Sequence, residues 1–329
     1  MGKLINEAVE PVKLNFTTML KFLPGEIKEE NFGSLHNISK DLVLKIHQQF
    51  TTDLNGIGYL STCPDNSTWI GNYTQKVIQR VKPEGSNLKV MSNFNMKIYG
   101  MAVTPSNDLL LVTEEPSRLQ QISGSSGQIT DSVYSVDPLH ITKVHVTSDY
   151  KFMVGAMTPG AVFPVKGRRV VIKMNKEGKH EKTYEHDRNK QPIFTYVRHI
   201  TTTSVGTIFV LDKLSDDWRG RVVVLGQDGD VINTYTGHPM INSDGKPFEP
   251  MCVVTTPLDN IIVSDMDTHT LHILNSVGHL ITYYNTNNIG ILYPWSLSFT
   301  TSGQLYIGCS TAQSSKDNAK IYTVEISQI

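Results

Sequence analysis

The sequence lacks a long apolar run, an excess of charge of one sign and more than a few cysteines. No stretch of the 329 residues approaches 18 uninterrupted apolar residues, so a transmembrane helix is not expected. Lys and Arg number 30 against 31 Asp and Glu, which provides no overall field for DNA or an anionic membrane. The cysteines are Cys63, Cys252 and Cys309, an odd number that favours reduced thiols. Residues 1–15 show no apolar signal-peptide core, and we expect a cytoplasmic protein.

Motifs of catalysis and metal binding are also missing. Residues 124–127 (GSSG) are too short for a nucleophile elbow, and no helix pattern follows them as a phosphate loop would require. The histidines show no spacing typical of a zinc site. The sequence therefore predicts a protein that is not an enzyme and that needs neither a cofactor nor a metal.

One phrase occurs six times in the chain. It is an apolar run that closes on Thr, then a turn, then a second apolar run that stops at Gly, Thr or Asp. The copies are roughly 42 to 56 residues apart, which is the range of repeats that each form one propeller blade. Their first runs begin at Tyr59, Met101, Val144, His199, Cys252 and Leu297.

The repeats predict an all-β fold, a six-bladed β-propeller over residues 41–329. Each unit divides into about four short strands separated by turn residues. The sixth unit lacks a fourth strand, and the alternating segment 42–50 has the length to supply it, which would close the ring and remove two exposed sheet edges. A jelly roll or two sandwiches would not produce six similar units. Residues 1–40 read as a partly ordered lead-in segment.

The repeats resemble those of NHL-repeat propellers, especially the C-terminal propellers of tripartite-motif (TRIM) proteins. The likeness lies in residues 100–105 (GMAVTP) with 111–114 (LVTE), and in 261–265 (IIVSD) with 271–280 (LHILNSVGHL). Residues 22–25 (FLPG) and 32–35 (FGSL) resemble the linker that precedes the propeller in invertebrate TRIM-like proteins. The chain has no Cys/His framework for a RING finger or B-box and no coiled-coil heptads, so the resemblance implies a substrate-recognition domain alone.

Long loops in the third and fourth units carry the candidate binding residues. Loops on a rigid ring commonly bind partners, and the mixture of cations and rings suits either a protein hot spot or a phosphate-bearing strand. The resemblance adds that some NHL propellers bind RNA. We expect partner-binding roles for Phe163, Lys166, Arg168, Arg169, Arg188, Tyr196, Arg198, Trp218, Arg219 and Phe248.

Strand-end carboxylates support a different class of function. Glu114, Asp212 and Asp265 end second runs, and converging carboxylates hold Ca²⁺ in gluconolactonase-type hydrolase propellers. Three equivalent positions are glycine (Gly71, Gly155 and Gly308), and the simpler interpretation is that strand-end carboxylates accept hydrogen bonds from turn amides.

The main prediction is a non-enzymatic scaffold that presents a loop face to a protein partner, as a TRIM substrate-recognition domain does. The first alternative is RNA binding through the basic and aromatic face of units three and four. The second alternative is a Ca²⁺-dependent hydrolase of the lactonase or esterase type.

Overall fold

The computed structural model describes residues 19–22, 35–38, 43–114, 116–312 and 317–327. The chain divides into two units, residues 44–326 and residues 1–43 with 327–329. In the smaller unit, β1 (Met19–Phe22) pairs antiparallel with β2 (Leu35–Ile38). We expected no strand in this segment, and the rest of it lies outside the described residues.

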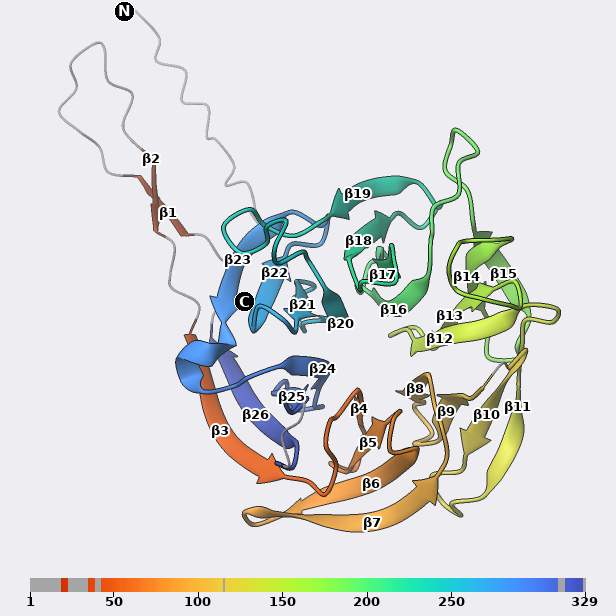
Figure 1. The fold of residues 1–329 in the computed structure, drawn as a ribbon, viewed down its shortest axis with the longest axis horizontal. Helices are drawn as coiled ribbons and strands as arrows, with labels where there is room; N and C mark the ends of the chain where they lie inside the picture. The colour runs from red at the N-terminus through yellow and green to blue at the C-terminus, as the bar shows by residue number, and fades with distance from the viewer. Residues whose placement is uncertain (1–18, 23–34, 39–42, 115, 313–316, 328–329) are drawn as a thin grey trace, which may run out of the picture. The chain divides into compact units, whose positions relative to one another are not determined.

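The larger unit is a six-bladed β-propeller, which confirms the predicted fold (Figure 1). Six four-stranded antiparallel sheets surround an axis, and the first strand of each blade lies innermost. Blade one is β4–β7 (Tyr59–Thr62, Thr68–Asn72, Val77–Glu84, Asn87–Asn95); blade two is β8–β11 (Gly100–Val103, Leu109–Val112, Arg118–Ile122, Ile129–Ser135); blade three is β12–β15 (His140–Val146, Phe152–Met157, Arg169–Met174, His180–Tyr184). Blade four is β16–β19 (Val197–Thr202, Ile208–Lys213, Gly220–Leu225, Val231–Tyr235); blade five is β20–β23 (Pro250–Thr255, Ile261–Asp265, Thr270–Leu274, Leu280–Asn285); blade six is β24–β26 (Pro294–Phe299, Leu305–Cys309, Lys320–Ser327) with β3 (Val43–Thr51). A 3₁₀ helix, η1 (Thr286–Ile289), follows β23.

The core lies between neighbouring blades. Second strands such as β9 and β21 are buried along their whole length, because each is covered by a blade on both faces. One cluster, for example, joins Leu110 and Val112 of blade two to Val154 and Ile172 of blade three. The outermost strands β7 and β15 alternate between exposed and more buried positions, as expected for a half-solvated edge.

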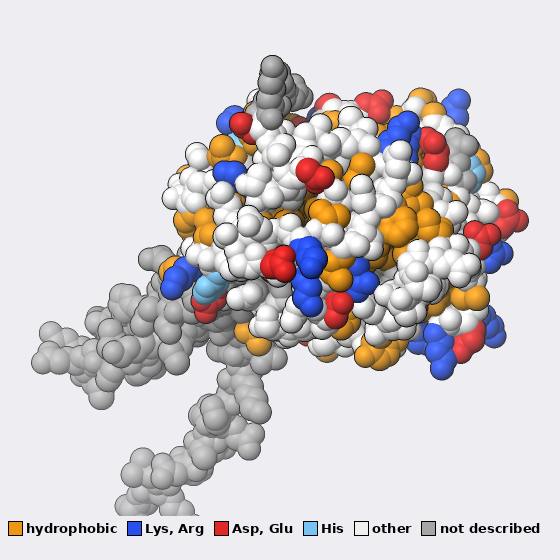
Figure 2. Space-filling model, turned by 90° about the horizontal axis from the view of Figure 1, so that it is seen from below, with side chains coloured by type: hydrophobic (Ala, Val, Ile, Leu, Met, Phe, Trp, Pro, Cys, Tyr) orange, Lys and Arg blue, Asp and Glu red, His pale blue; other side chains and the backbone are white. Residues whose placement is uncertain are grey.

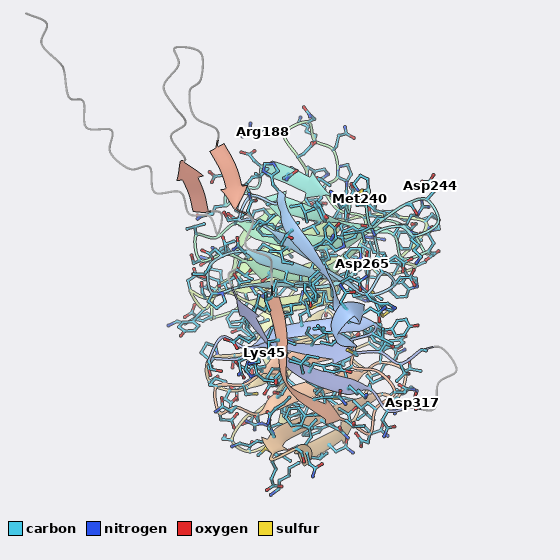
Figure 3. All side chains as sticks on the ribbon, turned by 90° about the vertical axis from the view of Figure 1, so that its left-hand side faces the viewer. Lys45, Arg188, Met240, Asp244, Asp265 and Asp317 are labelled. Atoms are coloured by element: carbon cyan, nitrogen blue, oxygen red, sulfur yellow. The ribbon has the colours of Figure 1, made fainter. Side chains whose placement is uncertain are left out.

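Strand β3 completes blade six, as predicted, with bounds one residue beyond the expected 42–50. On this strand, the Phe50 side chain is buried in the hydrophobic cluster between blades six and one, whereas Lys45 is exposed (Figure 3). The chain that follows continues the closure, since the Thr52 amide donates to the Ala319 carbonyl at 2.9 Å. In the described part of the chain, no helix is long and apolar enough to cross a membrane.

The strand register corrects one equivalence that we drew from the sequence. Gly155 and Gly308 are each the fourth residue of a second strand, whereas Asp212 and Asp265 are each the fifth. The glycines and the aspartates therefore do not occupy equivalent positions. The misalignment arose because the second runs differ in length by one residue in the sequence pattern.

Candidate functional site

One position on every innermost strand lines a small cavity at the axis of the ring. In each blade this residue pairs with the fourth residue of the second strand, as Lys143 does with Gly155. The cavity has a volume of about 60 Å³, and we call it the axial cavity. The six equivalent residues that line it are Tyr59, Gly100, Lys143, His199, Cys252 and Ser296.

Bulges bring a second set of side chains to the axial cavity. The ladder register shifts by one residue in four neighbouring innermost strands, at Thr142, Arg198, Met251 and Trp295. A β-bulge redirects a side chain and is common beside active sites. Arg198, Met251 and Trp295 line the axial cavity, whereas Thr142 does not. A Cβ atom at Gly58 would lie 3.1 Å from the Trp295 indole, so this glycine leaves the space that the ring occupies.

Lys143 extends from blade three across blade two toward blade one. A Cβ atom at Gly100 would lie 3.3 Å from Lys143 Cδ, so a glycine at this position admits the lysine chain. The amine donates to the Tyr99 carbonyl and lies 4.9 Å from the centroid of the Tyr59 ring. Burial, and then the charge of Arg198, lower the pKa of Lys143 to about 7.

Arg198 is the second cation of the axial cavity. Its Nη2 atom points to Met251 Sδ at 3.2 Å, and its Cζ atom lies 4.6 Å from the centroid of the Trp218 ring. Its Nε atom is buried and has no hydrogen-bond partner. Burial lowers the pKa of Arg198 from its usual value, although an arginine remains charged at neutral pH.

Neither cation of the axial cavity faces a carboxylate. The residues that line the cavity include no Asp or Glu, and no ion pair between described residues involves Lys143 or Arg198. Both residues are partly exposed, and both line the cavity. Buried charges in proteins are normally paired, so this arrangement indicates a site for an anion.

His199 and Cys252 carry no charge that would balance the two cations. His199 Nε2 and Cys252 Sγ are 3.4 Å apart, and the Leu297 amide donates to Sγ at 3.3 Å. Burial lowers the pKa of His199 to about 3 and raises the pKa of the Cys252 thiol to about 11. Both side chains are therefore neutral at pH 7, and His199 Nδ1 is buried without a partner.

The Trp218 ring lies against two cations, Arg198 and Lys213. The Lys213 amine lies 4.0 Å from the Trp218 ring centroid and 5.4 Å from that of Phe163. Trp218 is 46% exposed and has a left-handed backbone with φ of 69°, a strained conformation for a bulky residue that often occurs at functional sites. Of the predicted residues, Arg198 and Trp218 thus lie against each other, and the Lys213 amine lies near both Trp218 and Phe163. Burial raises the pKa of Tyr196, and the charge of Arg198 opposes that shift.

The other predicted arginines are occupied by contacts within the protein. Arg168 forms two hydrogen bonds with Glu185, at 2.9 and 2.7 Å. Arg188 pairs with Asp230, and Arg219 with Asp217. Figure 2 shows Lys and Arg side chains interspersed with Asp and Glu on the face that it presents. The ion pairs lower the net positive charge that these arginines could present to RNA.

Two of the predicted residues are buried and contact other parts of the protein. Arg169 is 3% exposed and donates to four backbone carbonyls, including those of Thr195 and Lys166. Phe248 is 4% exposed and packs edge-on against Tyr235 of blade four and His272 of blade five. A role for the ten residues in binding a partner stays a prediction.

The strand-end carboxylates do not converge on an ion. Asp212 accepts hydrogen bonds from the Thr195 and Tyr196 amides at 2.7 and 2.8 Å, as expected for a carboxylate that secures a turn. Asp265 (Figure 3) accepts one from the Asn242 side chain. Glu114 is exposed and pairs with Lys97. Among the described residues, no three His, Cys, Asp or Glu side chains form a group that could hold a metal ion.

Comparisons with known proteins identify the fold through solved structures. No family model and no curated protein matches the sequence, so the NHL and TRIM resemblance is not confirmed. A gluconolactonase from Xanthomonas campestris is 10% identical, with a TM-score of 0.61 over 87% of this chain and 90% of that chain. The PQQ-bound aldose sugar dehydrogenase from Streptomyces coelicolor is 11% identical, with a TM-score of 0.60 over 87% and 98%. Virginiamycin B lyase from Staphylococcus aureus is 12% identical, with a TM-score of 0.52 over 86% and 88%.

These comparisons contradict the prediction of a non-enzymatic scaffold. The similar solved chains are named as enzymes, whereas that prediction depended on the TRIM resemblance and on missing catalytic motifs. Sequence identities of this size show the shared ring alone and transfer no substrate. They favour the enzymatic alternative over the scaffold, and the axial cavity is where the described residues provide groups for chemistry.

Proposed function

We propose that this protein is an enzyme that binds a small anionic substrate in the axial cavity. The observation that supports the proposal most strongly is a pair of enclosed cations, Lys143 and Arg198, that share one cavity without a carboxylate. A protein gains nothing in stability from two like charges in one enclosed space, so such a pair suggests a functional constraint. An anion between them would restore the charge balance.

The two cations differ in the chemistry that they offer. Arg198 stays charged, and its buried, unpartnered Nε atom is available to bind the oxygen of a carboxylate. With a pKa of about 7, Lys143 is divided between ammonium and free amine at neutral pH, which suits a general acid–base catalyst. His199 and Cys252, on the innermost strands of blades four and five, contribute neutral hydrogen-bonding atoms to the cavity. We propose that Arg198 holds the anion and that Lys143 transfers a proton to or from the bound substrate.

Titration with formate, followed by tryptophan fluorescence, tests this proposal. Trp295 lines the axial cavity and Trp218 covers Arg198, so binding should change the emission. We expect saturable binding to the wild type and at least a tenfold weaker binding to Lys143→Met and Arg198→Met. Lys176→Met is the matched control, because Lys176 is exposed at a turn of blade three. Equal affinity in all four proteins would rule out the axial cavity as the anion site.

Two finer expectations from the sequence remain proposals. The three cysteines are buried and unpaired, which supports a cytoplasmic location. The spacing of the six units supports an NHL-type origin of the blades. RNA binding has weaker support, since Arg168, Arg188 and Arg219 are already paired with carboxylates.

A further inference from the structure

We propose that Lys143 forms an imine with the carbonyl carbon of a small oxo acid whose carboxylate is held by Arg198. This inference rests on the proposed function of the axial cavity and narrows its substrate class to carbonyl compounds that carry an anionic group. It assigns Lys143 as the nucleophile in addition to its exchange of protons.

The position of the Lys143 amine is suited to attack on a carbonyl carbon. The lysine chain crosses the gap left by Gly100 and ends beside the Tyr59 ring, where the Tyr99 carbonyl accepts one of its hydrogen bonds. No acidic side chain lines the cavity to hold the amine protonated. A lysine enclosed by protein and placed near another cation is the usual arrangement of a Schiff-base lysine.

The groups that face Lys143 favour the free amine near neutral pH. Arg198 opposes the ammonium by its charge, and Tyr59, His199 and Cys252 are neutral at pH 7 because burial raises the pKa of Tyr59 and Cys252 and lowers that of His199. His145, on the same strand, is also neutral, since burial lowers its pKa to about 4. None of these groups is an anion that would stabilise the protonated amine of Lys143.

The size of the axial cavity limits the substrate. A volume of about 60 Å³ exceeds the roughly 10–15 Å³ that one water needs, so it has room for a few waters or a molecule of two or three carbons. A 2-oxo acid of this size places its carboxylate and its carbonyl on adjacent carbons. The axial cavity brings together a guanidinium and an amine, the two groups that the carboxylate and the carbonyl of such a molecule require.

The reaction balances without a redox partner. The free amine attacks the carbonyl carbon, a C–N bond forms, and one amine proton moves to the oxygen to give a carbinolamine. A second proton, from solvent, converts the hydroxyl into a leaving water. The C–O bond breaks, and the product is a protonated imine and one water molecule. The step needs the free amine, so its rate should rise with pH through about 7.

Reductive trapping with pyruvate and sodium cyanoborohydride tests the inference on the full chain. The reductant converts the imine into a stable secondary amine, which intact mass and peptide mapping locate. We expect one adduct per chain, at Lys143, with formation rising through pH 7 and inhibited by formate. Acetone, which lacks the carboxylate, should react at least tenfold more slowly at the same concentration.

Variants separate this inference from the proposed function. Lys143→Met and Lys143→Arg should form no adduct at residue 143, Arg198→Met should slow trapping at least tenfold, and Lys176→Met should react as the wild type does. Formate binding with adducts spread over surface lysines would overturn the imine and leave the anion site in place. If the folded wild type neither binds formate nor forms the adduct, the imine and the anion site are both overturned.

Discussion

At the scale of single residues, the protein maintains charges that burial disfavours. Lys143 and Arg198 are enclosed at the ring axis, and each lacks the carboxylate that normally accompanies a buried cation. Placing them together costs stability in the folded state, a cost common where a site must bind or react. The ion pairs of Arg168 and Arg188 lie at exposed side chains, where such pairs contribute little to stability.

Removing the lysine charge should stabilise the protein in a pH-dependent way. The pKa of Lys143 falls from 10.5 to about 7 on folding, so between these values the unfolded chain binds one more proton than the folded chain. Wild-type stability should therefore rise with pH across this window, by at most about 1.4 kcal/mol per pH unit. Lys143→Met should be more stable than the wild type at pH 6, and the difference should shrink toward pH 10.

Urea unfolding of both proteins between pH 6 and pH 10 measures this difference. Lys176→Met serves as the control and should follow the wild type, since Lys176 is exposed. A gap between Lys143→Met and the wild type that stays constant over this pH range would show that Lys143 titrates as an ordinary lysine.

At the scale of strands, bulges and glycines determine what reaches the axis. Arg198, Met251 and Trp295 stand at bulges and line the axial cavity, and Gly58 leaves the space that the Trp295 ring occupies. A closer contact lies between blades three and four. A Cβ atom at Gly155 would lie 2.5 Å from Val197 Cγ1 of blade four, and 2.9 Å from Thr142 Oγ1 of its own blade.

The close contact at Gly155 makes the packing of blades three and four testable. Gly155→Ala should destabilise the protein by about 1–3 kcal/mol, because the added methyl group meets the Val197 side chain of the next blade. Gly245→Ala is the control, since a Cβ atom there meets no heavy atom within 4 Å. Urea unfolding at pH 7 measures both. Equal stability of the two variants would contradict the described distance between the blades.

Parts of the site could not be predicted from the strand pattern. Lys143 and Arg198 directly precede the first apolar runs of units three and four, and only Arg198 was among the predicted binding residues. Whether such a cation points to the axis depends on the register and on a bulge, and a period-two pattern does not reveal a bulge. The long loops combine cations with aromatic rings, which is a clearer pattern than a single lysine in a strand. The sequence therefore favoured Arg168 and Arg219 over Lys143.

At the scale of the whole ring, the architecture was predictable, whereas Arg198 alone of the residues that line the axial cavity was among the predicted binding residues. Six repeated pairs of apolar runs predict six blades, because both inner strands of a blade are buried by its neighbours. The axial cavity takes residues from all six blades, which are up to about 240 positions apart in the chain. Ring closure sets their distances, through contacts such as the hydrogen bond from Ser296 Oγ to the Ile57 carbonyl at 2.6 Å.

The location of an anion in the ring tests the central claim most directly. Crystals of the wild type and of Arg198→Met, soaked in bromide and measured at the bromine absorption edge, would reveal bound anions by anomalous scattering. A peak in the axial cavity between Lys143 and Arg198, lost in the variant, is the result that we predict. Bromide sites confined to the outer surface, with the axial cavity holding none, would contradict the account.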